Sequence, residues 1–210
     1  MQKDVSSPPP AQNTQSNVDT PGGAPGDTAT RAQRLFFALW PSEQSAAQIM
    51  AWARDAHAAF GGRMMRPETL HLTLAFLGNT PADRAGELAR SAAAWPAAVQ
   101  AVTLRRYGRF AGPRIVWAGP SESDRHTPPW LDDLYDDLWR RLEERGWQRP
   151  QSVFRPHVSL LRKAGPGDVT ALQRPPLTWM PEACVLVASE PREGGSHYRV
   201  LARMPLRAVG

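Results

Sequence analysis

The sequence predicts a protein of the α+β class that is built from two similar lobes. Apolar runs of strand length alternate with segments of helical periodicity, and this order occurs twice along the chain. Each half also contains one short apolar strand in which a histidine is followed, two residues later, by a hydroxyl side chain: residues 71–73 and residues 157–159. This faint internal duplication favours two related lobes, and 210 residues are enough to bury a core for both.

Composition narrows the function classes only slightly. The 25 basic and 20 acidic residues give a net charge of +5, which is consistent with an anionic partner, although a bias toward arginine in the genome explains it equally well. Cys184 is the only cysteine, so an intrachain disulfide is excluded and a cysteine-based metal site is not expected. There is no apolar stretch of about 18 residues and no secretory leader pattern, so we expect a cytoplasmic protein that does not enter a membrane.

The first half begins after a polar segment. Residues 1–32 contain hardly any large apolar side chain, so we expect a disordered tail followed by a two-lobed domain at residues 33–210. Residues 34–40 predict a buried strand, and Ser42 predicts the N-cap of a helix that ends at residues 61–62. A second strand is expected at residues 70–77. Thr80, Pro81 and Asp83 form a capping-box pattern, which predicts a helix running to about residue 95.

The second half is expected to open with a hairpin. Residues 102–104 and 114–118 have strand character, and the glycine-rich residues 108–113 between them predict its turn. A helix then begins at Pro128 or Pro129, carries a leucine stripe and stops at Gly146. Residues 158–161 predict a strand, and residues 185–188 and 198–204 predict a closing strand pair.

The two histidine strands carry the chemistry that the sequence predicts. The motifs are His71-Leu72-Thr73-Leu74 and His157-Val158-Ser159-Leu160. Because alternate side chains of a strand point to the same face, each motif presents an imidazole beside a hydroxyl, while its aliphatic residues anchor the opposite face. Histidine has an unperturbed pKa of about 6.5, so one copy can act as a base while the other acts as an acid. The hydroxyls can donate hydrogen bonds to phosphoryl oxygens.

The segments around these motifs, residues 70–78 and 154–162, resemble the 2H phosphoesterase superfamily. They are similar to the bacterial and archaeal RNA 2',3'-cyclic phosphodiesterases, historically called 2'-5' RNA ligases, and the likeness extends to residues 34–40, 108–119 and 182–206. The resemblance implies a bilobal, LigT-like fold. In this fold, two pseudo-symmetric lobes of antiparallel sheet with outer helices surround a central cleft.

The resemblance also implies a role for each site residue. His71 would donate a proton to the 3'-oxygen leaving group, and His157 would accept a proton from water, which leaves a 2'-phosphate. Thr73 and Ser159 would bind the phosphate, although a threonine is commoner at the second position. Arg162 would neutralise phosphate charge, but strand alternation from His157 places it on the wrong face, so the strand must bulge or end before it.

The implied enzyme is a metal-independent monomer without a cofactor. Its substrate would be RNA with 2',3'-cyclic phosphate ends, tRNA fragments among them, and the reverse reaction would form 2'-5' bonds. Two alternatives stay open: the same chemistry on 2'-5' oligonucleotides, small cyclic nucleotides or an ADP-ribose cyclic phosphate, and a non-catalytic binder of RNA ends. Among the aromatic residues, Tyr107 or Phe110 is the better candidate for stacking on a base, whereas alternation assigns Phe76 to the core.

Overall fold

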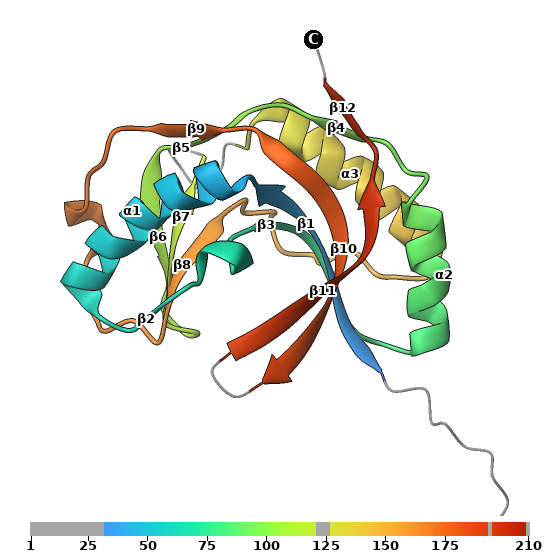
Figure 1. Cartoon of the computed structure of the whole chain (residues 1–210), viewed down its shortest axis with the longest axis horizontal. Coiled ribbons are helices and arrows are strands. Elements are labelled where there is room, and N and C mark those ends of the chain that lie inside the picture. The colour runs from blue at the N-terminus through green and yellow to red at the C-terminus, as the bar shows by residue number, and fades with distance from the viewer. Residues whose placement is uncertain (1–31, 121–126, 193–194, 209–210) are drawn as a thin grey trace, which may run out of the picture.

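A computed structural model describes residues 32–120, 127–192 and 195–208. The expected tail, residues 1–32, lies outside this range except for its last residue, so its disorder remains a prediction. In the described part, three α-helices are interspersed among the strands as the sequence predicts, although four strands follow one another between the second and third helices (Figure 1). No helix of the described residues is long and apolar enough to cross a membrane.

Most strands belong to one sheet in which neighbouring strands along the main path are antiparallel. Its strands, in spatial order, are β11 (Gly195–Met204), β10 (Pro181–Arg192), β1 (Gln33–Pro41), β3 (Leu72–Thr80), β8 (Val158–Arg162), β7 (Ile115–Gly119) and β6 (Arg106–Phe110). The short β2 (Arg63–Met64) also pairs with β8. Two smaller pairs lie beside this sheet: β12 (Leu206–Ala208) with β4 (Ala97–Val99), and β5 (Val102–Leu104) with β9 (Leu177–Trp179).

The main sheet divides into two lobes between β3 and β8. These two strands share the matched pair Leu72 and Val158, whereas every other neighbouring pair in the sheet is matched over a longer register. One lobe consists of β11, β10, β1 and β3, and the other of β8, β7, β6 and β2. The predicted two-lobed α+β architecture is therefore present, with the two histidine motifs at the junction of its lobes.

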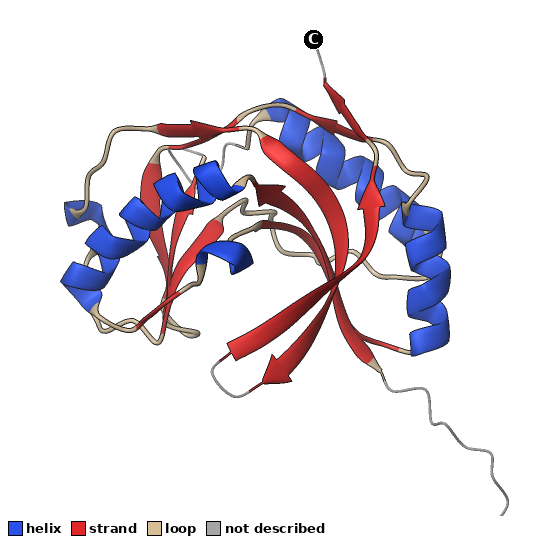
Figure 2. Cartoon of the chain, in the orientation of Figure 1, coloured by secondary structure: helices blue, strands red, loops and turns tan. Residues whose placement is uncertain are grey.

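The helices α1 (Glu43–Phe60), α2 (Ala82–Ala92) and α3 (Pro129–Glu143) bury their apolar sides in a core shared with the sheet (Figure 2). Helix α1, capped by Ser42 as predicted, packs against β8 and β2, whereas α3 packs against β3 and β4. Helix α1, from the first half of the sequence, therefore lies against the lobe of β8, and α3, from the second half, lies against β3 of the other lobe, whereas α2 packs against β11 and β1. Leu72 and Val158, fully buried in this core, fix the orientation of both motifs.

The capping prediction for α2 was wrong. Thr80 does not cap α2: it is the last residue of β3, and its buried hydroxyl donates to the Gly78 carbonyl at 3.5 Å. Pro81 occupies the N-cap position without a side-chain hydrogen bond, and α2 ends at Ala92, earlier than expected. The capping-box pattern failed because β3 continues through Gly78, which takes a φ of 71°.

The predicted hairpin also has different strands. β5 pairs with β9, and the partner of β7 is instead β6, which contains part of the stretch that was assigned to the turn. Gly108 lies within β6, where its lack of a side chain lets the Trp117 ring pass close to the backbone. A Cβ at Gly108 would lie 2.0 Å from the Trp117 ring, so this glycine provides space and not a turn.

A bulge in β8 gives Arg162 the orientation that the sequence required. Val116 pairs with Leu161 and Trp117 pairs with Ser159, so Leu160 is the extra residue. Leu160 and Leu161 are consequently both buried, and the exposed Arg162 returns to the face of Ser159. The expected break in alternation is confirmed.

A corresponding bulge in β3 contradicts the assignment of Phe76 to the core. Ala38 pairs with Thr73 and Phe37 pairs with Ala75, which leaves Leu74 as the extra residue. Phe76 therefore points to the same face as Thr73, where it is 48% exposed. Phe76 follows its histidine at the same spacing as Arg162 follows His157, so the two are equivalent positions of the internal duplication.

We expect Gly108→Ala to lower the free energy of unfolding by about 1 to 3 kcal/mol, because the added methyl group has to displace the Trp117 ring. Gly112→Ala is the matched control in the same hairpin, since a Cβ there has no neighbour within 4 Å. Urea unfolding of both variants measures the difference. Equal stabilities would show that the ring at residue 117 is free to move.

Candidate active site

The pairing between β3 and β8 brings the four motif side chains together. They are His71, Thr73, His157 and Ser159, all partly accessible, whereas Leu72 and Val158 between them are buried. Residues that flank a matched antiparallel pair face each other in reverse order. Each histidine therefore lies opposite the hydroxyl residue of the other strand. The pairs expected within each motif thus become a cluster of four.

His71 is held by a backbone carbonyl and by three aromatic rings. Its Nδ1 donates to the carbonyl oxygen of Thr69 at 2.7 Å. The imidazole stacks on Phe36 and Trp40, with ring centroids 4.9 and 5.1 Å away, and meets Tyr198 edge-on at 5.5 Å. Sequence reasoning missed this aromatic enclosure, although alternation along β1 does place Phe36 and Trp40 on one face.

His157 has the same kind of support in the other lobe. Its Nδ1 donates to the carbonyl oxygen of Arg155 at 2.7 Å. Phe110 meets the imidazole edge-on at a centroid distance of 4.9 Å, and Trp117 lies at 5.8 Å. Phe110 is therefore at the site, as the sequence suggested. Tyr107 is not, because it is buried in the core and its hydroxyl donates to the Trp52 carbonyl.

These bonds fix the tautomer of both neutral imidazoles. A carbonyl oxygen can only accept, so in each ring Nδ1 carries the hydrogen. Nε2 is then the atom that takes up or releases a proton. Both histidines use the carbonyl two residues earlier in the chain, so the internal duplication extends to their hydrogen bonds.

Burial makes both imidazoles weaker bases. It lowers the pKa of His71 to about 4; the bond to the Thr69 carbonyl opposes this shift, whereas the positive charges of His157 and Arg162 add to it. Burial also lowers the pKa of His157, again opposed by the bond to its carbonyl partner. In the ligand-free protein both rings are therefore neutral at neutral pH. The charge of Arg162 contributes to the lowered pKa of His71, so this guanidinium lies near the first motif.

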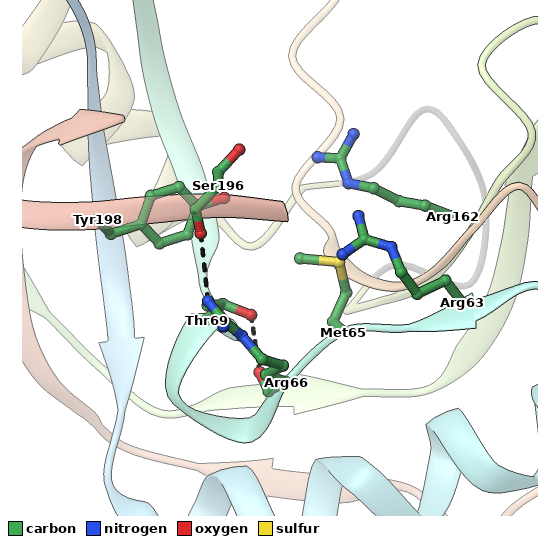
Figure 3. A pocket seen from close by; sticks show the side chains of 7 residues that line it. All are labelled: Arg63, Met65, Arg66, Thr69, Arg162, Ser196 and Tyr198. Atoms are coloured by element: carbon green, nitrogen blue, oxygen red, sulfur yellow. Dashed lines mark hydrogen bonds between the residues drawn. The ribbon is translucent and has the colours of Figure 1, made fainter. Parts of the chain in front are cut away.

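The surroundings of the two histidines differ in character. A pocket of about 500 Å³ next to His157 is lined by Thr73, Phe76 and Phe110, among other residues. On the side of His71, a smaller pocket is lined by arginines, and Arg162 is one of them (Figure 3). Phe76, which follows the bulge in β3, therefore lines the pocket beside His157, and Arg162, which follows the bulge in β8, lines the cationic pocket beside His71.

Other polar side chains take structural positions. Arg109 donates to the carbonyl oxygens of Ala164 and Gly165 and so holds the loop after β8. Cys184 is buried. Among residues 32–120, 127–192 and 195–208, no three His, Cys, Asp or Glu side chains are grouped as metal ligands.

Comparison with known proteins identifies the family. The model of the LigT like Phosphoesterase family matches residues 39–117. The RNA 2',3'-cyclic phosphodiesterase of Escherichia coli is 30% identical over 176 residues, which cover 83% of this chain and 97% of the relative. The protein of the same name from Thermus thermophilus is 30% identical over 193 residues, covering 83% and 90%. The crystal structure of E. coli LigT with 3'-AMP matches at a TM-score of 0.68 and 30% identity, covering 83% of this chain and 98% of LigT.

The chain belongs to the LigT-like phosphoesterase family. The bilobal LigT-like fold predicted from the sequence is confirmed by the match to the solved structure. The expectation of a phosphodiesterase is confirmed at the level of the class, because the relatives are named RNA 2',3'-cyclic phosphodiesterases.

The lowered pKa of His71 predicts how stability depends on pH. An unfolded histidine titrates near about 6.5, so between about pH 4 and 6.5 the unfolded chain binds more protons at His71 than the folded chain does. The free energy of unfolding should therefore fall as the pH is lowered through this window. We expect His71→Gln to show a smaller fall than wild type, measured by urea unfolding across the window. The exposed His57, replaced in the same way, serves as control and should retain the wild-type slope.

Proposed function

We propose that this protein hydrolyses the 2',3'-cyclic phosphate at RNA ends and leaves a 2'-phosphate. The observation that carries the proposal is the cluster of two histidines, each with its tautomer fixed by a carbonyl and each opposite a hydroxyl residue of the other strand. Such a pair supplies one proton acceptor and one proton donor on either side of a phosphate. The names of the relatives support this substrate class.

In the proposed reaction His157 Nε2 removes a proton from water, and the oxygen of that water forms a bond to phosphorus. The bond from phosphorus to the 3'-oxygen breaks, and His71 Nε2 gives this oxygen its proton. Thr73 and Ser159 donate hydrogen bonds to the other phosphoryl oxygens, and Arg162 balances their charge. None of these steps requires a metal ion.

The proposed proton donor has to gain its proton after the substrate binds. The pKa of His71, about 4, leaves it neutral in the free protein at neutral pH. A bound phosphodiester carries a negative charge, which favours the protonated imidazole and raises its pKa. The cationic form of His71 is therefore stabilised by the substrate on which it acts.

The aromatic side of the site fits a nucleoside. Phe76 is exposed and Phe110 lies beside His157, so both can contact the apolar face of a base or ribose. The crystal structure of E. coli LigT in complex with 3'-AMP supports a nucleotide as the ligand. Because the same acid and base operate in both directions, formation of 2'-5' bonds is proposed as the reverse reaction. A non-catalytic binder would have no need for two oriented imidazoles.

We expect His71→Ala and His157→Ala each to reduce hydrolysis of a short RNA with a 2',3'-cyclic phosphate end by at least about 100-fold, because each substitution removes one proton-transfer group. The measurement is release of the 2'-phosphate end, with EDTA present throughout. His57→Ala, at an exposed histidine of α1, is the matched control and should keep full activity.

Two results would overturn this proposal. A wild-type protein that binds RNA ends without hydrolysing them would favour the binder. Loss of activity with EDTA alone would show that a metal ion takes part.

We also expect bell-shaped pH profiles for both kcat/KM and kcat, with the two maxima at different pH values. The profile of kcat/KM reports the free enzyme, in which the pKa values of both histidines are lowered, so its maximum should lie on the acid side of 6.5. The profile of kcat reports the complex, where the phosphate charge raises both pKa values, so its maximum should lie at higher pH. Coincident maxima, or a flat profile, would contradict the division of labour between the histidines.

A further inference from the structure

A compact pocket beside His71 contains a concentration of positive charge. Its described lining consists of Arg63, Met65, Arg66, Thr69, Arg162, Ser196 and Tyr198 (Figure 3). None of these residues is acidic. Arg63 in β2 and Arg66 in the turn that precedes η1 (Pro67–Thr69) belong to one short segment, whereas Arg162, at the end of β8, comes from a distant part of the chain.

Backbone pairing brings two of these cations together. Arg63 of β2 is matched with Arg162 of β8, and Figure 3 shows their guanidinium groups side by side, opposite Ser196 and Tyr198. An anion that binds between two guanidinium groups offsets their mutual repulsion. A phosphate suits this arrangement because guanidinium groups bind its oxygens with two hydrogen bonds each.

Arg66 is anchored at the same pocket but can still bind a ligand. Its guanidinium donates to the Ser196 carbonyl oxygen at 3.2 Å and forms a 3.1 Å ion pair with Glu68. That ion pair is exposed, so it contributes little stability and a phosphate can replace it at small cost. Burial raises the pKa of Tyr198, and nearby arginine charges act against that rise. The phenol therefore remains a neutral hydrogen-bond donor at the rim.

The pocket adjoins the proposed reaction centre on the His71 side. Thr69 lines the pocket and accepts the hydrogen bond of His71, and Tyr198 lines it and contacts the same imidazole. The charge of Arg162 reaches His71 as well. The aromatic pocket lies on the other side, at His157.

The connectivity of ribose matches the arrangement of the two pockets, with the arginines beside His71 and the aromatic residues beside His157. In the proposed reaction His71 protonates the 3'-oxygen. C3' is bonded to C4', which carries the 5'-carbon, so the 5'-oxygen lies on the His71 side of the reacting phosphate. The base is attached through C2' and C1' and lies toward the opposite side. A nucleoside held with its base near Phe76 and Phe110 therefore directs its 5'-oxygen toward the arginine pocket.

We propose that Arg63 and Arg66, in the pocket whose wall Arg162 completes on the side of the reaction centre, bind the phosphate attached to the 5'-oxygen of the terminal nucleoside. This inference rests on the proposed function and extends it: the preferred substrate carries a second phosphate, one nucleoside away from the cyclic phosphate. In an RNA chain that group is the last internucleotide phosphate. In a free nucleotide it is a 5'-phosphate.

Three substrates test the proposal at one fixed salt concentration: adenosine 2',3'-cyclic phosphate, the same compound with a 5'-phosphate, and the dinucleotide ApA with a 2',3'-cyclic phosphate. We expect the 5'-phosphate to raise kcat/KM by about tenfold or more, as one charge-assisted hydrogen bond would, and the dinucleotide to share this gain. The double variant Arg63→Ala, Arg66→Ala should bring the ratio of the first two substrates close to one. Arg90→Ala, at an exposed arginine of α2, should keep the wild-type ratio.

A ratio that the double variant leaves unchanged would overturn the subsite. A gain confined to the dinucleotide would also overturn it, because the enzyme would then recognise the preceding nucleoside and not the phosphate. Failure to hydrolyse any of the three would count against the proposed function alone. In that case calorimetric binding of adenosine 3'-phosphate and adenosine 3',5'-bisphosphate decides the subsite: the bisphosphate should bind about tenfold more tightly to wild type and equally to the double variant.

Discussion

The architecture of the site depends on a very short contact between two strands. β3 and β8 meet at the pair Leu72 and Val158, both fully buried, and this pair joins the two lobes of the main sheet. Its burial determines which face of each strand points inward, so the histidine and hydroxyl of both motifs must point outward and toward each other. A shift of one residue would send all four side chains into the core. The hydrophobic packing of two aliphatic side chains therefore sets the geometry of the polar cluster.

The internal duplication makes the histidines chemically alike, and their surroundings make them different. Each imidazole donates from Nδ1 to a carbonyl two residues earlier, so neither bond distinguishes a proton donor from an acceptor. The difference comes from equivalent positions beyond the bulges, where one lobe has Phe76 and the other has Arg162. Under the proposed mechanism, the direction of proton transfer is a property of these neighbours and not of the catalytic rings.

Simple periodicity predicted the lobes, the helices and the two motifs, because burial repeats along strands and helices. It failed where the backbone departs from regular pairing. Extra residues at Leu74 and Leu160 reverse the alternation. The sequence predicts only the bulge at Leu160, because the family resemblance places Arg162 at the phosphate. Phe76 is apolar and is compatible with a position in the core, so nothing in the sequence indicates the bulge at Leu74. Likewise the pattern at Thr80 satisfied the rules of helix capping locally, but strand pairing took precedence. Partners in a sheet are decided by distant segments, which local sequence does not reveal.

The position of β1 between β10 and β3 has a consequence for synthesis of the chain. Among the described strands β1 is made before the others, yet one of its edges stays unpaired until β10, near the opposite end of the described chain, has been made. Its residues 35–39 are entirely buried in the finished fold, so the nascent chain exposes an apolar strand edge throughout most of translation. Tyr198, which borders His71, is added later still. Because these pairings join distant segments, a chain that ends before β11 does not carry a complete site.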